Sequence, residues 1–101
     1  FTDPATGAVR LACGSRRKSD VRVFDPVAGG EALVVLEVGS DVYALAVFTD
    51  PATGAVRLAC GSRRKSDVRV FDPVAGGEAL VVLEVGSDVY ALAVFTDPAT
   101  G

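Results

Sequence analysis

The feature that most constrains this chain is an exact internal repeat. Residues 1–47 are identical to residues 48–94, and residues 95–101 (FTDPATG) begin a third copy. A period of 47 residues without a mismatch is typical of folds in which each unit is one module that buries its apolar faces against its neighbours. We interpret residues 1–101 as one domain of two such units, whereas repeat folds usually need at least about three. The chain by itself is therefore expected to be structurally incomplete.

Composition narrows the class of protein. Half of the residues are hydrophobic and 23% are charged, which is typical of a globular chain. The longest apolar run, residues 42–48, is much shorter than the roughly 20 residues of a membrane span, so no membrane association is expected. The net charge of -3 argues against a nucleic-acid partner. The chain begins at Phe1 and contains no Met, which indicates a processed product, an excised segment or an engineered sequence. The localisation is unknown from the sequence: cytoplasmic if the protein is natural, because its cysteine usage fits a reducing compartment, and recombinant if it is designed.

The sequence of each unit predicts four short strands separated by turns. Alternating or β-branched apolar residues predict the strands, and Asp-Pro and Gly-Gly pairs mark turns. The predicted strands span residues 9–13, 21–24, 32–38, 42–48, 56–60, 68–71, 79–85 and 89–95. Their connections are too short for parallel crossovers, which need a dozen residues or more, so each unit is predicted to be a four-stranded antiparallel meander. The third and fourth strands of a unit are apolar on both faces, and radial stacking of small sheets in an all-β propeller satisfies that requirement.

The repeat unit resembles the WD-repeat β-propeller family. LACGS is similar to the family's LASGS strand, VRVFD to its VRVWD strand, ALVVLEVGS to its LxxLxGH segment and VYALAV to its VxxLAF innermost strand, in the same cyclic order. The resemblance implies two blades per chain, each a four-stranded antiparallel sheet, with residues 42–48 as an innermost strand. One complete blade then crosses the repeat boundary, and the remaining strands at the two ends belong to incomplete blades that complement each other. The chain departs from the family in having no His and no Trp: Ser40 stands in place of the His and Phe24 in place of the Trp.

Two blades alone would expose two apolar sheet faces, and monomers rarely tolerate apolar patches larger than a few hundred Å². We therefore expect copies of the chain to associate head to tail into a closed ring, a trimer with six blades or a tetramer with eight. The alternative is that the chain is a segment of a longer perfect-repeat propeller. Residues 95–101 duplicate residues 1–7, so both cannot occupy the same junction. Perfect identity indicates either recent amplification or deliberate design, and we favour design.

The residues that catalysis usually needs are missing. Without His, no Ser/His/Asp or Cys/His arrangement is possible, and the lone Cys13 and Cys60 make no zinc site. Both cysteines are interpreted as small buried apolar residues. Asp3, Asp25 and Asp41 lie beside turns, where Asp accepts hydrogen bonds from the backbone. No enzymatic activity, cofactor or metal is predicted.

One local run of positive charge remains. It consists of Arg16, Arg17 and Lys18, and returns as Arg63, Arg64 and Lys65. The family layout places this turn on one face of the ring, where copies would form a basic crown able to bind an acidic or anionic partner. The simpler interpretation is a solvated hairpin tip. We thus expect a self-assembling structural scaffold, with a module that binds anionic partners as the alternative.

Overall fold

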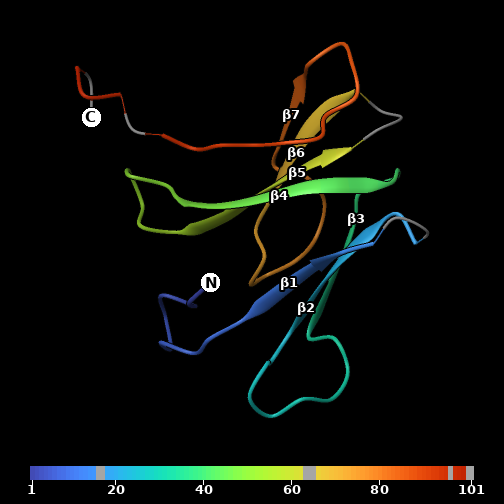
Figure 1. Ribbon diagram of the computed structural model, residues 1–101. Coiled ribbons are helices and arrows are strands. Elements are labelled where there is room, and N and C mark those ends of the chain that lie inside the picture. The colour runs from blue at the N-terminus through green and yellow to red at the C-terminus, as the bar shows by residue number, and fades with distance from the viewer. Residues whose placement is uncertain (16–17, 63–65, 96, 100–101) are drawn as a thin grey trace.

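The computed structural model describes residues 1–15, 18–62, 66–95 and 97–99 (Figure 1). These residues form seven strands and no helix, so none of them belongs to a helix that could cross a bilayer. The strands are β1 (Leu11–Gly14), β2 (Asp20–Phe24), β3 (Val34–Glu37), β4 (Val42–Thr49), β5 (Val56–Ser62), β6 (Asp67–Phe71) and β7 (Val81–Glu84). The prediction of an all-β chain is confirmed.

The strands form two antiparallel sheets of consecutive neighbours. The first sheet has the order β1-β2-β3, and the second has the order β4-β5-β6-β7. Equivalent strands pair in the same register, since Leu11 lies opposite Phe24 in the first sheet and Leu58 lies opposite Phe71 in the second. The first sheet therefore matches the last three strands of the second and lacks a counterpart of β4.

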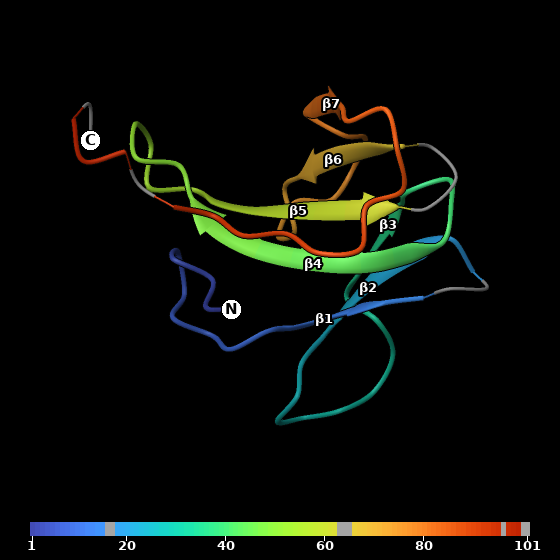
Figure 2. The same ribbon diagram turned by 45° about the horizontal axis from the view of Figure 1, so that its top comes forward.

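The predicted strand at residues 89–95 is not formed, although its sequence is identical to that of residues 42–48 in β4. A strand exists only with a hydrogen-bonded partner, and β4 has β5, whereas the described residues after 95 form no strand. Residues 89–95 instead run across the second sheet (Figure 2), where Val89 and Leu92 pack against apolar residues of β5 and β6.

The ends of other strands also differ from the prediction. β1 begins at Leu11 and not at residue 9, because Val9 forms only an isolated bridge with Thr2. β3 is shorter than the predicted 32–38, since the N–H groups of Val38 and Gly39 donate to the carbonyl oxygen of Ser19 in the neighbouring turn.

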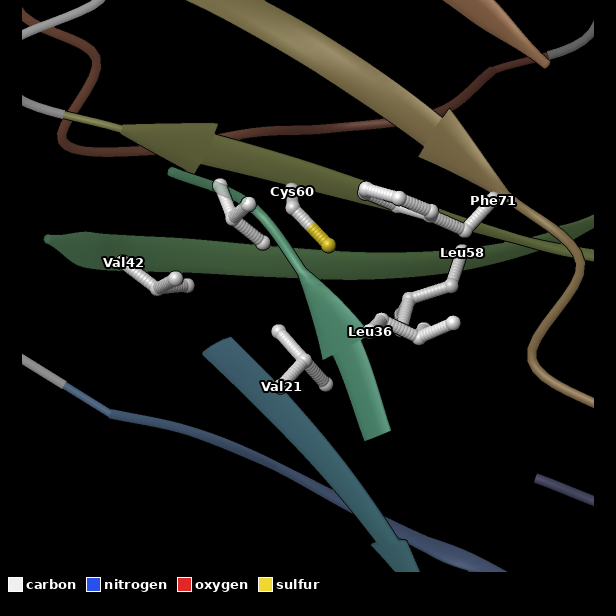
Figure 3. Close-up of a cluster of buried hydrophobic side chains, with 7 residues drawn as sticks. Val21, Leu36, Val42, Leu58, Cys60 and Phe71 are labelled. Atoms are coloured by element: carbon white, nitrogen blue, oxygen red, sulfur yellow. The ribbon is translucent and has the colours of Figure 1, made fainter. Parts of the chain in front are cut away.

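The main core lies between the two sheets (Figure 3). It combines buried side chains of both sheets: Val21, Leu36, Val38, Val42, Leu58, Cys60 and Phe71. Each fully buried Val, Leu or Phe stabilises the fold by about 1.5–3 kcal/mol relative to an exposed one. The contact between the sheets therefore contains the larger of the two clusters of buried apolar residues among the described ones.

The Asp-Pro turns are closed by aspartate side chains, as predicted for Asp3 and Asp25. Oδ1 of Asp3 accepts a hydrogen bond from the Ala5 N–H at 2.9 Å. Oδ1 of Asp25 accepts from Val27 and Ala28, both at 2.9 Å. These carboxylates hold the backbone of the turns that connect the strands.

Candidate interaction site

Identical residues of the two repeats differ sharply in burial. Leu58 of β5 is 0% exposed because it faces the first sheet, whereas its counterpart Leu11 of β1 is 50% exposed. Cys60 is buried and its counterpart Cys13 is exposed. We define the first-sheet outer face by Leu11, Cys13 and Phe24, which are the counterparts of the buried Leu58, Cys60 and Phe71.

At the other end of the structure, the residue of the first repeat is buried and its counterpart in the second repeat is exposed. Leu36 of β3 is 0% exposed, and its counterpart Leu83 of β7 is 51% exposed. We define the second-sheet outer face by Val68, Val70 and Leu83, which are the counterparts of Val21, Val23 and Leu36 in the first sheet. The two valines are covered by Val89 and Leu92, but no second sheet lies over this face.

An apolar hollow of about 350 Å³ lies between the second sheet and the segment that follows β7. Its lining comprises Phe48, Ala59, Val68, Val70, Leu83, Leu92, Ala93, Val94 and Phe95. Among the described residues that line it, none is charged. Its chemistry suits an apolar surface.

The two outer faces are the two halves of an interface that the chain already makes once within itself. Between the sheets, Val21 and Leu36 bury Leu58, Cys60 and Phe71 in the main core. The second-sheet outer face repeats the residues of the first group, and the first-sheet outer face repeats those of the second group. The outer faces therefore carry the same two sets of residues that meet between the sheets.

The predicted basic site is visible only in small part. Arg16, Arg17, Arg63, Arg64 and Lys65 lie outside the described residues. Lys18 is exposed, and its N–H donates to the Ser15 Oγ at 3.1 Å. Recognition of an anionic or acidic partner by this turn therefore stays a prediction.

The two thiols occupy different environments. Burial raises the pKa of the Cys60 thiol to about 12, so at neutral pH it is a protonated apolar group. The prediction that both cysteines are buried holds for Cys60 and is wrong for Cys13, because no sheet covers the first-sheet outer face.

The tyrosines of the two repeats contact each other. The rings of Tyr43 and Tyr90 have centroids 5.2 Å apart and are tilted by 51°. The hydroxyl of Tyr90 donates to the Asp88 Oδ2 at 3.3 Å, and the Tyr90 ring is exposed. The pair ties the beginning of β4 to the segment that follows β7.

Among residues 1–15, 18–62, 66–95 and 97–99, no group of three or more Cys, Asp or Glu side chains is placed to hold a metal ion. Comparisons with protein-family models, with curated proteins and with solved structures found no match to this chain. The resemblance to WD-repeat propellers therefore rests on the sequence fragments alone. The sequence predicted two exposed apolar faces but did not identify their residues. The alternation of Val68 and Val70 with Arg69 was the signal that marked one of them.

Proposed function

We propose that this chain is a self-assembling structural scaffold, a two-blade fragment of a WD-repeat-like β-propeller whose ring is completed by further copies of itself. The observation that carries the proposal is the unequal burial of identical residues at Leu11 and Leu58, and at Leu36 and Leu83. Each outer face lacks the partner that its counterpart has inside the chain.

In this proposal the second sheet is a complete blade and the first sheet is a blade without its inner strand. The second-sheet outer face of one copy covers the first-sheet outer face of the next, and repeats the contact between the two sheets. Because the two faces differ, the association is head to tail and must either close into a ring or continue as a filament. Repetition of one interface at every step favours a ring, of six blades from three copies or eight from four.

The energetics favour association. Burial of one exposed Leu, Val or Phe contributes about 1.5–3 kcal/mol, while association costs an estimated 4–15 kcal/mol in lost freedom. Leu11 and Phe24 on one face, with Leu83 and Val85 on the other, would be buried at each contact together with their neighbours. These side chains are already about half-buried in the single chain, so each supplies about half of that gain, and together with their neighbours they offset a cost at the lower end of that range.

The test is the native mass of the chain in solution. We expect a species of three or four times the chain mass of 10.3 kDa, which corresponds to a closed ring of six or eight blades. A monomer at micromolar concentration would contradict the proposal.

A matched pair of variants locates the interface. Leu83→Glu places a charge on the second-sheet outer face and is expected to give monomers. Val27→Glu adds the same charge in the exposed loop after β2, where the side chain is 88% exposed, and is expected to keep the native mass. Equal behaviour of the two variants would show that the outer face is not the interface.

A further inference from the structure

The N-terminus of the chain takes the place of an inner strand beside β1. Phe1 and Arg10 exchange two backbone hydrogen bonds, from the Phe1 amino group to the Arg10 carbonyl oxygen at 2.8 Å and from the Arg10 N–H to the Phe1 carbonyl oxygen at 2.7 Å. Thr2 forms an antiparallel bridge with Val9. These two pairs continue the first sheet on the side of β1 that faces away from β2.

The same pairs occur in the second sheet, where they are the end of β4. Phe48 lies opposite Arg57, and Thr49 lies opposite Val56. These residues are the exact counterparts of the N-terminal set, 47 positions later. Phe1 and Thr2 therefore occupy the positions in the first sheet that the last two residues of β4 occupy in the second.

The turn that follows Phe1 and Thr2 is also formed. The N–H of Asp3 donates to the carbonyl oxygen of Ala8 at 2.8 Å, as the N–H of Asp50 does to Ala55 at the same distance. Asp3 is buried, and it lines a hollow together with Pro73 from the loop after β6. The first copy of FTDPATG is thus held by its own hydrogen bonds, and its Asp3 is buried near the loop after β6.

The third copy has a different environment. Phe95 is 87% exposed, whereas Phe1 and Phe48 are half-buried. Asp97 is exposed, although its Oδ1 accepts from the Ala99 N–H as in the other copies. Within its described residues the third copy closes its local turn, but Asp97 is exposed whereas Asp3 is buried.

Most of the edge of β1 remains open. β1 pairs only with β2 among the described strands. β4 has eight residues. In the first sheet, Phe1 and Thr2 already occupy the positions beside β1 that correspond to the last two residues of β4. The open part of the edge therefore matches the counterparts of residues 42–47, which are residues 89–94.

We propose that residues 89–94 of one copy add to the open edge of β1 in the next copy and end where that copy's Phe1 begins. One inner strand is then built from two chains, and the FTDPATG sequence that begins at Phe95 is left outside the sheet. The occupant of the edge is a second copy of this chain, because only that sequence repeats the β4 to β5 pairing. This inference rests on the proposed head-to-tail assembly and specifies which of the duplicated ends enters it.

The register of the exchanged strand can be tested with a disulfide. Leu45 lies opposite Cys60 in the second sheet, so Leu92 is expected opposite Cys13 of the next copy. Directly opposed residues of antiparallel strands have Cα atoms about 4.5–5.5 Å apart, within the range that a disulfide spans. Leu92→Cys, treated with diamide as the oxidant of the two thiols, is expected to give covalent species larger than one chain that revert with dithiothreitol.

The control for this register is Ala93→Cys. Ala46, its counterpart, lies opposite Ala59, so a cysteine at position 93 would point to the other face of the sheet from Cys13. We expect at least tenfold less crosslinked product from this variant. Absence of intermolecular product from Leu92→Cys, or equal amounts from both variants, would overturn the inference.

A second pair of variants tests which copy of the turn is used. Asp3→Ala removes the buried carboxylate that accepts a hydrogen bond from the Ala5 N–H, and is expected to lower the thermal midpoint of the assembly by several degrees. Asp97→Ala makes the same change in the same local sequence and is expected to leave the midpoint unchanged. Equal effects, or a larger effect at Asp97, would overturn the inference.

Deletion of residues 95–101 provides an independent measurement that does not depend on a destabilised turn. We expect the native mass and the thermal midpoint of the shortened chain to equal those of the full chain. Loss of assembly on deletion would overturn the inference. The native mass of the unaltered chain distinguishes the two levels: a monomer rejects the proposed function, whereas an assembly that fails these tests rejects only the split strand.

Discussion

Gly14 lies beneath Val42 so closely that no side chain fits between them. A Cβ atom at Gly14 would be 2.8 Å from the Val42 Cγ1. The same relationship recurs one repeat later, where a Cβ atom at Gly61 would be 2.5 Å from the Val89 Cγ1. The close contact between the first sheet and the beginning of β4 thus recurs between the second sheet and Val89, although residues 89–95 form no strand.

This contact predicts a strong coupling between Gly14 and Val42. Gly14→Ala would force Val42 to move and is expected to cost about 1–3 kcal/mol of unfolding free energy, as overpacking typically does. Val42→Ala creates space for the new methyl group. The double variant should therefore lose less unfolding free energy than the two single variants lose in sum. Denaturant unfolding of all four proteins measures the coupling. Additive effects would show that the two residues do not limit each other.

The two cysteines should report the assembly. At pH 8 we expect a thiol reagent to modify Cys13 rapidly in the dissociated chain and Cys60 only after unfolding, since burial raises the pKa of Cys60 to about 12. In the assembled protein the preceding copy covers Cys13, and neither thiol should react rapidly. A concentration series with Cys13→Ser and Cys60→Ser variants measures this difference. A Cys13 that reacts equally fast at every concentration would argue against coverage of the first-sheet outer face.

Part of the loss of folding stability at acid pH is expected to come from Asp25. Hydrogen bonds from the backbone N–H groups of Ala28 and Val27, with a smaller effect of the Arg10 guanidinium, hold the pKa of its carboxyl below the ordinary value. Because the folded pKa is lower than the unfolded one of about 3.9, this contribution is present above pH 4 and is lost as the pH falls through the folded value. Asp25→Asn keeps an acceptor oxygen but does not titrate. Thermal midpoints measured from pH 6 to pH 2.5 should therefore fall less in Asp25→Asn than in the unaltered chain; parallel curves would contradict the assignment.

Ser19 and Ser66 have φ angles of 59° and 55°, in the left-handed region. A side chain costs roughly 1–2 kcal/mol there, and a β-branched one more. We expect Ser19→Val to lose more than about 1 kcal/mol of unfolding free energy, and Ser19→Gly to be at least as stable as the serine, because glycine adopts this region freely. Chemical denaturation of the two variants checks the order. A valine variant as stable as the glycine variant would mean that this backbone conformation is not maintained in solution.

Local patterns were sufficient for most of the fold. The alternation of Val21 and Val23 with Arg22 predicted β2, and the Asp-Pro pairs predicted the turns that Asp3 and Asp25 close. Residues 42–48 and 89–95 have one sequence but different structures, so no local pattern can separate them. Their difference comes only from the presence or absence of a neighbouring strand.

The candidate site shows the same limit. Exposed apolar faces followed from the small number of units, but the sequence makes Leu11 and Leu58 indistinguishable. Only the three-dimensional arrangement shows that one is buried and the other is open. The basic turn was easy to recognise in the sequence, and most of it lies outside the described residues.

The identity of residues 42–47 and 89–94 has a kinetic consequence for folding. Either segment can pair with β5 or with the β1 edge of any chain, and the contacts that result are the same. β4 reaches β5 first because residues 50–55 tether the two strands, which gives an effective concentration in the millimolar range for a short flexible connection. As the protein concentration approaches that range, pairing between chains competes with pairing within a chain. Refolding from denaturant at high concentration should therefore trap domain-swapped species, whereas refolding at high dilution should not.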